Sequence, residues 1–195
     1  ENCFLCACAH NQNVEIIQYL VDVIQMDVMH LNKSGDNCLI MGCRTNYSVQ
    51  VIKYLINDLK MDMNHTNHTD ATCFQCCCQC NENPDVLKYL MDSNPSQCLI
   101  FDDGSDCLMW ACCGNKSLDV IKYLVEKGNH SVRRRDDQGT DCLMEACIGS
   151  YGIEIIKYLC QRGADVNQVN TLGYNCLMYA CSATKMNLEI IEYLV

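Results

Sequence analysis

The side chains best suited to metal chemistry lie in a cysteine-rich segment at residues 73–80. Four cysteines there follow helical spacings of three and four residues, which would place them on one face, and two histidines precede them. These residues are Cys73, Cys76, Cys77, Cys80, His65 and His68. Cysteine and histidine are the usual ligands of structural zinc. Ligands on one straight helix cannot surround a tetrahedral ion, however, so we predict packed thiols here, with no metal and no cofactor.

The sequence offers no recognisable catalytic motif. It contains no glycine-rich phosphate loop after a strand, no Gly-x-Ser-x-Gly turn and no His-Glu-x-x-His pair. With 19 cysteines and five histidines, a cysteine–histidine pair can be matched by chance. Asp27 and Asp165 recur at one place in a repeating pattern, which is typical of turn residues. We therefore predict that the protein is not an enzyme.

Most of the cysteines belong to a motif that the chain repeats six times, as in Asn-Cys-Leu-Met-Tyr-Ala-Cys at residues 175–181. In each copy a second cysteine follows five residues after the first. The pairs are Cys3 and Cys8, Cys38 and Cys43, Cys73 and Cys78, Cys107 and Cys112, Cys142 and Cys147, and Cys176 and Cys181. The first cysteines are 34 or 35 residues apart. A fixed period of this length indicates a stacked repeat array in which neighbouring units share a core.

The paired cysteines are predicted to be free thiols. Five helical residues turn by about 140°, so the two thiols of a pair face different ways and cannot bridge. Helices of neighbouring units would lie ~8–10 Å apart, beyond the separation of ~7 Å that a disulfide tolerates. Small apolar thiols suit a tight helix seam. Unoxidised cysteine in this number favours a reducing compartment, and hence a cytoplasmic location.

Six Asn-x-Ser/Thr sequences favour a different location. They begin at Asn32, Asn46, Asn64, Asn67, Asn115 and Asn129, all in predicted loops. The motif is the acceptor of N-linked glycans in secreted proteins. Loops are also rich in these residue types because they stabilise turns, so the motif can arise without glycosylation. A secreted, glycosylated protein is therefore the alternative to a cytoplasmic one.

Each repeat is predicted to contain two helices. An Asn, Asp or Thr before the first cysteine is a preferred N-cap for a short apolar helix. A polar loop then leads to an amphipathic second helix, such as residues 118–125. Gly128 and Gly163 are expected to follow second helices in the left-handed conformation. The first two repeats lack this glycine, and their second helices are expected to continue through residues 23–24 and 59–60.

The segment Gly-Ala-Asp-Val-Asn at residues 163–167 resembles the end of an ankyrin repeat. Residues 170–174, Asn-Thr-Leu-Gly-Tyr, resemble the start of that repeat, and residues 154–159, Glu-Ile-Ile-Lys-Tyr-Leu, resemble its second helix. The chain departs from the family where Thr-Pro-Leu-His is usual, because a polar residue and a cysteine stand there. The resemblance implies an all-α solenoid of about six helix-turn-helix repeats with β-turn or hairpin tips.

The resemblance covers the whole chain and implies one repeat domain over residues 1–195. The expected repeats are residues 1–31, 32–66, 67–100, 101–135, 136–169 and 170–195. Ankyrin arrays usually end in polar capping repeats, and neither end here has that character. The chain is therefore expected to be part of a longer array.

The family that the sequence resembles shares a scaffold rather than an activity. The leading hypothesis is a non-catalytic scaffold that binds another protein through its concave face and turn tips. One alternative is a structural subunit whose uncapped terminal repeats associate end to end; another is a metal-binding or redox-sensing protein. The net charge of −10 disfavours nucleic acid as the partner. The sequence contains no run of 18 apolar residues, so we predict no membrane span.

Partner contacts are expected where repeats differ, because repeat-constant residues serve the stack. In the family that this chain resembles, partners lie against the tips and the first helices. The matching tip residues are Lys33, Ser34, Asp36, His68, Thr69, Asp102, Asp103, Ser105, Asp137, Gln138, Thr140, Thr171, Leu172 and Tyr174. The variable first-helix residues are Arg44, Trp110, Glu145, Ile148 and Tyr179. Aromatic residues of this set are candidate anchors if they are exposed.

Two further patterns each have two interpretations. One tyrosine recurs in every second helix, at Tyr19, Tyr54, Tyr89, Tyr123, Tyr158 and Tyr193. These tyrosines either pack with their hydroxyl groups at the rim or form a binding ladder. A basic run at residues 133–135 is followed directly by Asp136 and Asp137, which either screen it or leave it for an acidic partner.

Overall fold

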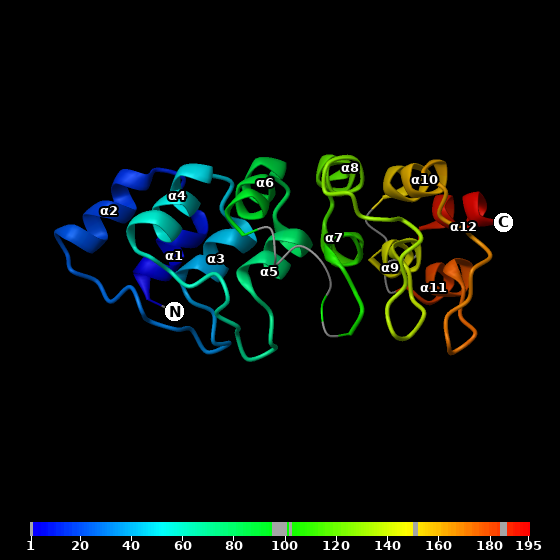
Figure 1. Cartoon of the computed structure of the whole chain (residues 1–195), viewed down its shortest axis with the longest axis horizontal. Coiled ribbons are helices and arrows are strands. Elements are labelled where there is room, and N and C mark those ends of the chain that lie inside the picture. Colours follow the sequence, from blue (N-terminus) through cyan, green and yellow to red (C-terminus); the bar gives the residue numbers. More distant parts are fainter. Residues whose placement is uncertain (1, 95–100, 102, 150–151, 184–186) are drawn as a thin grey trace. The chain divides into compact units, whose positions relative to one another are not determined.

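The chain folds into successive pairs of short helices (Figure 1). The computed structural model describes residues 2–94, 101, 103–149, 152–183 and 187–195, and the chain divides into two compact units, residues 1–95 and 96–195. The first unit contains α1 (Cys3–His10), α2 (Val14–Asp22), α3 (Cys38–Thr45), α4 (Val49–Lys53) with the π-helical turn η1 (Tyr54–Asp58), α5 (Cys73–Cys80) and α6 (Pro84–Ser93). The second contains α7 (Cys107–Gly114), α8 (Leu118–Glu126), α9 (Cys142–Gly149), α10 (Ile153–Gln161), α11 (Cys176–Ser182) and α12 (Leu188–Leu194).

Within each unit the helices form two rows (Figure 1). In the first row, α3 packs between α1 and α5, and α9 packs between α7 and α11. In the second row, α4 lies between α2 and α6, and α10 lies between α8 and α12. The described residues contain no β-strand, only isolated bridges that join Thr66 to Thr72 and Arg135 to Asp141. The all-α prediction is confirmed, whereas a single domain over residues 1–195 stays a prediction.

The first helices begin at the polar residues that the sequence suggests. The side chains of Asn2, Asn37, Asp106, Asp141 and Asn175 each accept a hydrogen bond from the main-chain N–H three residues later. Thr72 forms a reciprocal capping box with Gln75. These caps satisfy N–H groups that a helix leaves without partners at its start. The Asn, Asp or Thr before each first cysteine therefore fixes where each first helix starts.

The paired cysteines form the centre of the seam between neighbouring first helices. Ten of the twelve paired cysteines are buried, and the other two, Cys3 and Cys181, are exposed. The thiol of the second cysteine of one repeat forms a hydrogen bond with the thiol of the first cysteine of the next, as in Cys8 with Cys38 and Cys43 with Cys73. Burial and this thiol–thiol hydrogen bond raise the pKa of Cys43 well above its usual range. Cys43 is therefore a protonated, neutral filler rather than a nucleophile.

The same seam in the second unit has the same construction. The Cys112 thiol forms a hydrogen bond with the Cys142 thiol, and the Cys147 thiol forms one with the Cys176 thiol. The hydrogen bond from Cys112, followed by burial, raises the pKa of Cys142. Large apolar residues of both helix rows are also buried: Leu39, Phe74, Ile52 and Leu87 in the first unit, and Leu108, Leu143, Ile121 and Ile156 in the second. Every cysteine that the structure describes is a free thiol, as predicted.

In the first unit, a buried asparagine joins the second repeat to the first and the third repeat to the second. Asn46 Nδ2 donates to the carbonyl oxygens of Cys8 and Asn11 at 2.9 and 2.8 Å. One repeat later, Asn81 Nδ2 donates to the carbonyl oxygens of Cys43 and Asn46, both at 2.9 Å. The Cys8 and Cys43 carbonyls lie in the last turns of α1 and α3, where a helix cannot satisfy its own C=O groups. This asparagine ladder therefore supplies partners to buried carbonyl groups across each seam.

The tips are closed turns in which one polar side chain holds the loop. Oδ1 of Asn32, Asn67, Asp136 and Asn170 accepts the N–H groups two and four residues later. A glycine with positive φ, or Asp70 in the third repeat, completes each turn. Neighbouring tips are linked by main-chain hydrogen bonds, for example from the Asp137 N–H to the Asp103 carbonyl at 3.0 Å. The tips therefore form an ordered surface.

Four second helices, α2, α8, α10 and the one formed by α4 and η1, are followed by a residue in the left-handed conformation. In the fifth repeat this residue is Gly163, with φ 95°, as predicted. In the fourth repeat it is Asn129, with φ 57°, so the prediction of Gly128 is wrong by one position. A Cβ atom on Gly128 would lie 2.7 Å from the Leu124 carbonyl oxygen, so close packing explains this glycine.

In the first two repeats a long side chain occupies that left-handed position. Gln25 and Lys60 have φ values of 55° and 53°. Consequently α2 ends at Asp22 and η1 ends at Asp58, and the prediction that these helices continue is wrong. Such a conformation costs a residue other than glycine about 1–2 kcal/mol. The main-chain hydrogen bonds from the Met26 N–H to the Leu20 carbonyl and from the Met61 N–H to the Leu55 carbonyl, both 3.0 Å, help to offset that cost.

The recurring tyrosine packs with its hydroxyl group at the rim. Tyr89 Oη donates to Asn57 of the preceding repeat at 3.1 Å, and Tyr158 Oη donates to Glu126 at 3.2 Å. Lys53 Nζ lies 5.4 Å from the centre of the Tyr89 ring, which suits a cation–π contact. These contacts join neighbouring second helices, and they support the packing interpretation.

Removing one rung of the asparagine ladder should destabilise the stack strongly. We expect Asn46→Ala or Asn81→Ala to lower the free energy of unfolding by about 2–3 kcal/mol, because two buried carbonyl groups lose their donor. The matched control is Gln12→Ala, which removes an exposed amide from the same unit and should cost under ~0.5 kcal/mol. Urea unfolding followed by circular dichroism measures both. An Asn81→Ala loss no larger than the control's would show that the ladder is dispensable.

Candidate partner-binding surface

The predicted partner residues fall into three classes of exposure. Exposed are Lys33, Ser34, His68, Thr69, Asp103, Asp137, Gln138, Ile148, Thr171, Leu172 and Tyr174. Half-buried are Arg44, Trp110, Glu145 and Tyr179, and buried are Asp36, Ser105 and Thr140. Asp102 lies outside the described residues. Most of the predicted tip residues are therefore accessible to a partner.

Two of the buried residues hold the tips together. Asp36 accepts hydrogen bonds from the side-chain amides of Asn32 and Asn67 at 3.0 and 2.8 Å, and Arg44 lies 3.4 Å away. Thr140 is held by its N–H bond to Asp136 Oδ1 at 2.8 Å. These contacts leave Asp36 and Thr140 inside the tips, so they support the surface rather than form it.

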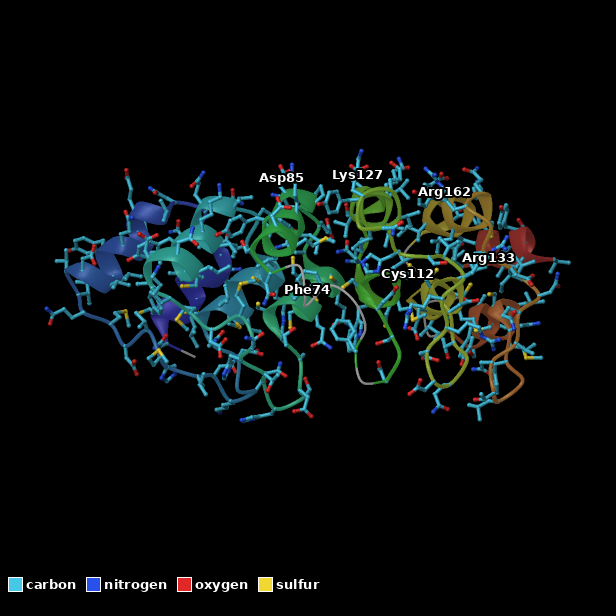
Figure 2. The ribbon with its side chains drawn as sticks, in the orientation of Figure 1. Phe74, Asp85, Cys112, Lys127, Arg133 and Arg162 are labelled. Atoms are coloured by element: carbon cyan, nitrogen blue, oxygen red, sulfur yellow. The ribbon has the colours of Figure 1, made fainter. Side chains whose placement is uncertain are left out.

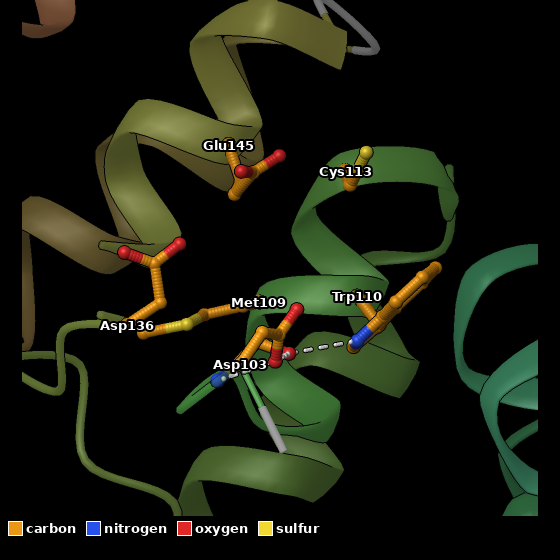
Figure 3. A pocket seen from close by; sticks show the side chains of 7 residues that line it. Asp103, Met109, Trp110, Cys113, Asp136 and Glu145 are labelled. Atoms are coloured by element: carbon orange, nitrogen blue, oxygen red, sulfur yellow. Dashed lines mark hydrogen bonds between the residues drawn. The ribbon is translucent and has the colours of Figure 1, made fainter. Parts of the chain in front are cut away.

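In the second unit, four predicted residues meet at one cavity, shown in Figure 3. Its volume is about 120 Å³, and it is lined by Asp103, Ser105, Met109, Trp110, Cys113, Asp136 and Glu145. Two tips and the helices α7 and α9 supply these residues. A water molecule occupies ~30 Å³ of liquid, so the cavity holds the equivalent of about four. That is enough room for the end of one side chain from another molecule.

A chain of hydrogen bonds fixes the aromatic wall of this cavity. Trp110 Nε1 donates to Ser105 Oγ at 3.0 Å, and Ser105 Oγ donates to Asp103 Oδ1 at 2.5 Å (Figure 3). The Phe101 ring meets the Trp110 ring edge to face, with their centres 6.2 Å apart. A side chain held at both its nitrogen and its ring loses little entropy on binding. Trp110 is therefore a pre-organised wall, and Ser105 positions it.

The cavity is acidic. It is lined by the carboxyl groups of Asp103, Asp136 and Glu145, and none of its seven lining residues is basic. Burial raises the pKa of Glu145, a hydrogen bond with Cys113 opposes this, and three nearby aspartates raise the pKa further. Unlike charges brought close to such a group would favour its ionised form. The cavity is therefore suited to a cation.

Sequence analysis missed three lining residues, Met109, Cys113 and Asp136. Met109 stands where other repeats have Leu5, Ile40 or Met144, so nothing in the sequence singles it out. Cys113 is equivalent to Arg44 and Ile148, which were selected as variable residues, so the same comparison could have found it. Asp136 does carry a signal, because Asn32, Asn67 and Asn170 hold the equivalent turn with an uncharged amide. A carboxylate at this position is not required by the turn, and that departure could have marked the site.

A second exposed patch lies at the last tip of the same unit. Leu172 and Tyr174 are exposed there, as predicted, together with Val169 and Met178, which sequence analysis did not select. The Tyr174 and Tyr179 rings lie 5.5 Å apart, and Tyr179 Oη accepts a hydrogen bond from Asn170 at 2.8 Å. Both rings are therefore positioned at the surface without being covered.

The cysteine-rich helix α5 packs its thiols into the stack. Cys73 and Cys77 are buried in the seam, and Cys76 Sγ accepts a hydrogen bond from Arg44 at 3.4 Å. His65 Nε2 hydrogen-bonds the Gly35 carbonyl oxygen at 2.9 Å. Among the described residues, no three His, Cys, Asp or Glu side chains are placed to hold a metal ion. This geometry gives the metal alternative no support.

The six glycosylation motifs lie in different environments. Asn46, Asn67 and Asn115 are buried, and Asn46 and Asn67 use their side-chain amides in the hydrogen bonds described above. A glycan on either nitrogen would displace those bonds. Asn64 and Asn129 are exposed. Glycosylation stays a prediction, and in the folded chain these two sites are open to it.

The arginines at residues 133–135 form hydrogen bonds with main-chain carbonyl groups rather than ion pairs with Asp136 and Asp137. Arg133 Nε donates to the Gly163 carbonyl at 2.9 Å, and Arg134 Nε donates to the Gly104 carbonyl at 3.2 Å. Arg135 donates to the carbonyl groups of Gly139 and Val169. Figure 2 shows where Arg133 lies among the other side chains. Each arginine thus braces a neighbouring loop, which neither interpretation of the sequence foresaw.

These features define an ankyrin-repeat protein. The family model described as ankyrin repeats, in three copies, matches residues 45–136, 74–170 and 129–195. Because these matches span well over half of the sequence, the chain belongs to the ankyrin-repeat family. No curated protein sequence matches it at a significant level. None of its described helices has the length and apolarity that a membrane crossing requires.

Solved structures of low sequence identity share this fold. One is titled "Bd0816 Predatory Endopeptidase from Bdellovibrio bacteriovorus in complex with immunity protein Bd3460". The matched chain is 18% identical, with a TM-score of 0.68, over 100% of this chain and 97% of that one. Another is the ankyrin repeat domain of Bcl-3, a member of the IkappaB family. It is 19% identical, with a TM-score of 0.59, and the match covers 92% of this chain and 76% of that one. At these identities the likeness shows the ankyrin fold alone.

Thiol labelling should separate the packed cysteines from the exposed ones. We expect iodoacetamide to modify Cys3, Cys6 and Cys181 rapidly in the native protein, because these thiols are exposed. The buried interior thiols should react about 100-fold more slowly unless urea is added, because they need local opening. Peptide mass spectrometry measures the rates, and the intact mass beforehand reports any glycan. Rapid labelling of Cys43 or Cys142 would contradict the packing described here.

Proposed function

We propose that this protein is a non-catalytic scaffold that binds a partner protein through its tips and the adjoining face of its first helices. One observation carries the proposal. Repeat-constant side chains are buried in the seams, whereas side chains that differ between repeats, such as Leu172 and Trp110, line an accessible surface with a cavity. Variation confined to a surface on a rigid scaffold is typical of a binding site.

The chemistry of the thiols supports a non-catalytic role. A nucleophilic cysteine needs a lowered pKa and access to substrate. The pKa of Cys76 is raised by burial even though Arg44 beside it acts in the opposite direction, and burial also raises the pKa of Cys80. The thiols that sit nearest to a cation are therefore still poor nucleophiles. The solved complex of an endopeptidase with an immunity protein is consistent with protein binding by proteins of this fold.

The protein is further proposed to work in a reducing compartment, as the free thiols favour. Secretion with glycans on Asn64 and Asn129 is the alternative, because these two acceptors are exposed. The two proposals predict different intact masses. A mass equal to that of the unmodified chain supports the first, whereas an excess removed by a glycosidase supports the second.

A tip substitution should reduce capture of the partner. We expect Leu172→Glu to lower recovery at least ten-fold in cross-linking capture from the cells that make the protein, because it places a charge in the apolar tip patch. The matched control is Leu188→Glu. Leu172 is 72% exposed and Leu188, at the start of α12, is 66% exposed. Quantitative mass spectrometry measures recovery.

Two results would oppose the proposal. One is that Leu172→Glu recovers the same proteins in the same amounts as the unchanged chain. The other is that both variants lose them equally, which would indicate that exposed apolar area, rather than the tip, causes capture. Circular dichroism confirms that each variant is folded.

End-to-end stacking is a second candidate function, favoured by the outer face of α2. Ile16 and Tyr19 are 43% and 53% exposed, whereas their equivalents one repeat later, Val51 and Tyr54, are 0% and 9% exposed. Cys3 is likewise exposed although the equivalent cysteines are buried. In the second and third repeats this face is covered by the preceding repeat. The last repeat of a second copy would therefore fit it, and such head-to-tail contacts generate filaments.

Sedimentation velocity tests the stacking. If it occurs, the average mass should rise with protein concentration, and Ile16→Asp should weaken association at least ten-fold by burying a charge. Ile148→Asp is the control, since Ile148 is 41% exposed on a different surface. A single monomeric species at high micromolar concentration would remove this candidate, as would equal effects of the two substitutions.

A further inference from the structure

We propose that the cavity between the fourth and fifth repeats binds a basic side chain of the partner protein, arginine in preference to lysine. Trp110 forms the stacking wall, and Asp103, Asp136 and Glu145 supply the opposing charge (Figure 3). This inference deepens the proposed scaffold function, on which it rests, by stating what the partner must present.

The aromatic wall is the first support. Trp110 lines the cavity, and its Nε1 is already committed to Ser105, so the ring and not the N–H is what the occupant meets. Trp is the aromatic side chain that attracts cations most strongly through its ring face. The contact from Phe101 fixes the ring further. A bound cation therefore needs no rearrangement of this wall.

The placement of the carboxyl groups is the second support. Oδ1 of Asp103 and Oδ1 of Asp136 accept hydrogen bonds within their own tips. Among the described residues, neither Oδ2 atom accepts one, so each carboxylate has capacity left for a donor. The three carboxyl groups do not converge closely enough to form a metal site. Acceptors spread around a cavity suit a flat organic cation with several N–H groups.

Arginine fits this arrangement better than lysine. A guanidinium presents five donors in a plane, stacks on aromatic rings and loses less hydration than an ammonium group. The cavity of about 120 Å³ has room for such a head group. The net charge of −10 also favours approach of a basic partner, because the field of the whole chain attracts it.

The negative charge of Asp136, one of the cavity residues, is not needed to hold its turn. Asp136 holds its turn with Oδ1, and Asn32, Asn67 and Asn170 do the same in other tips with no charge. Asp136→Asn should therefore fold normally. This gives a substitution that removes charge from the cavity without altering the turn.

The chain has a single tryptophan, so its fluorescence reports on this cavity alone. The probes are N-acetyl-argininamide and N-acetyl-citrullinamide, which have the same shape and differ in charge. We expect the arginine compound to change the Trp110 emission in a saturable way with a dissociation constant on the order of millimolar. The citrulline compound should bind at least ten-fold more weakly, because it lacks the charge.

Three variants locate the effect. Glu145→Gln and Asp136→Asn should each weaken binding of N-acetyl-argininamide about three- to ten-fold, in keeping with charge-assisted hydrogen bonds. Asp119→Asn removes the same charge from the exposed start of α8 and should leave binding unchanged. An equal loss in all three would mean that only net charge matters, and it would overturn the assignment.

The dependence on pH provides an independent readout. Burial raises the pKa of Glu145, so this group is protonated at a higher pH than an exposed glutamate. Binding of the cation should therefore be complete at neutral pH and weaken as the pH falls through the raised pKa. Glu145→Gln should shift this loss to lower pH, because the group with the raised pKa is then absent. An unchanged profile in this variant would contradict a role for Glu145.

Other ligands give distinct outcomes that would also overturn the proposal. Saturable quenching by calcium chloride alone would indicate a divalent cation site, and equal binding of the citrulline compound would indicate an apolar pocket. If Trp110 fails to respond while Leu172→Glu still abolishes capture, this inference fails and the scaffold function stands. If Trp110 responds but Leu172→Glu does not affect capture, the cavity binds a cation and the proposed scaffold function fails.

Discussion

The stack depends on satisfying carbonyl groups that helix ends leave without donors. A first helix of eight residues cannot satisfy the carbonyls of its last turn, and the tight seam excludes water from them. Asn46 and Asn81 place one amide against two such groups each. The neutral thiols fill the space beside this polar contact without introducing charge. Both seams of the first unit use this contact, and each repeat there depends on its neighbour for burial of these groups.

The sequence predicts the parts of the fold that repeat, since a period of 34 or 35 residues reports six times on the same environment. The helix pairs, the N-caps and the buried cysteine pairs are therefore predictable. Helix ends are less so, because left-handed residues are tolerated wherever closing hydrogen bonds offset their cost. Gln25, Lys60 and Asn129 show this, and Gly128 is present for packing instead.

The candidate site is only partly predictable, because it depends on side chains from different repeats. Trp110, Glu145 and Asp103 are identifiable as departures from the repeat. That they enclose one cavity with Asp136 follows from the stacking of α7 on α9 and of one tip on the next. Arg133, Arg134 and Arg135 illustrate the reverse case, since an unusual run of charge proves to brace loops. Departure from a repeat therefore marks candidates, and packing decides among them.

The asparagine ladder also bears on how the chain is made. Asn46 is both the amide that bridges two repeats and the first residue of an acceptor sequence for N-linked sugar. Enzymes that attach such sugars reach a nascent polypeptide before its repeats have stacked. If this chain were secreted, sugar transfer and folding would compete for one nitrogen atom, and a molecule modified there would lose the Asn46 bonds across its first seam. The order of these two events during synthesis would thus decide whether the molecule matures.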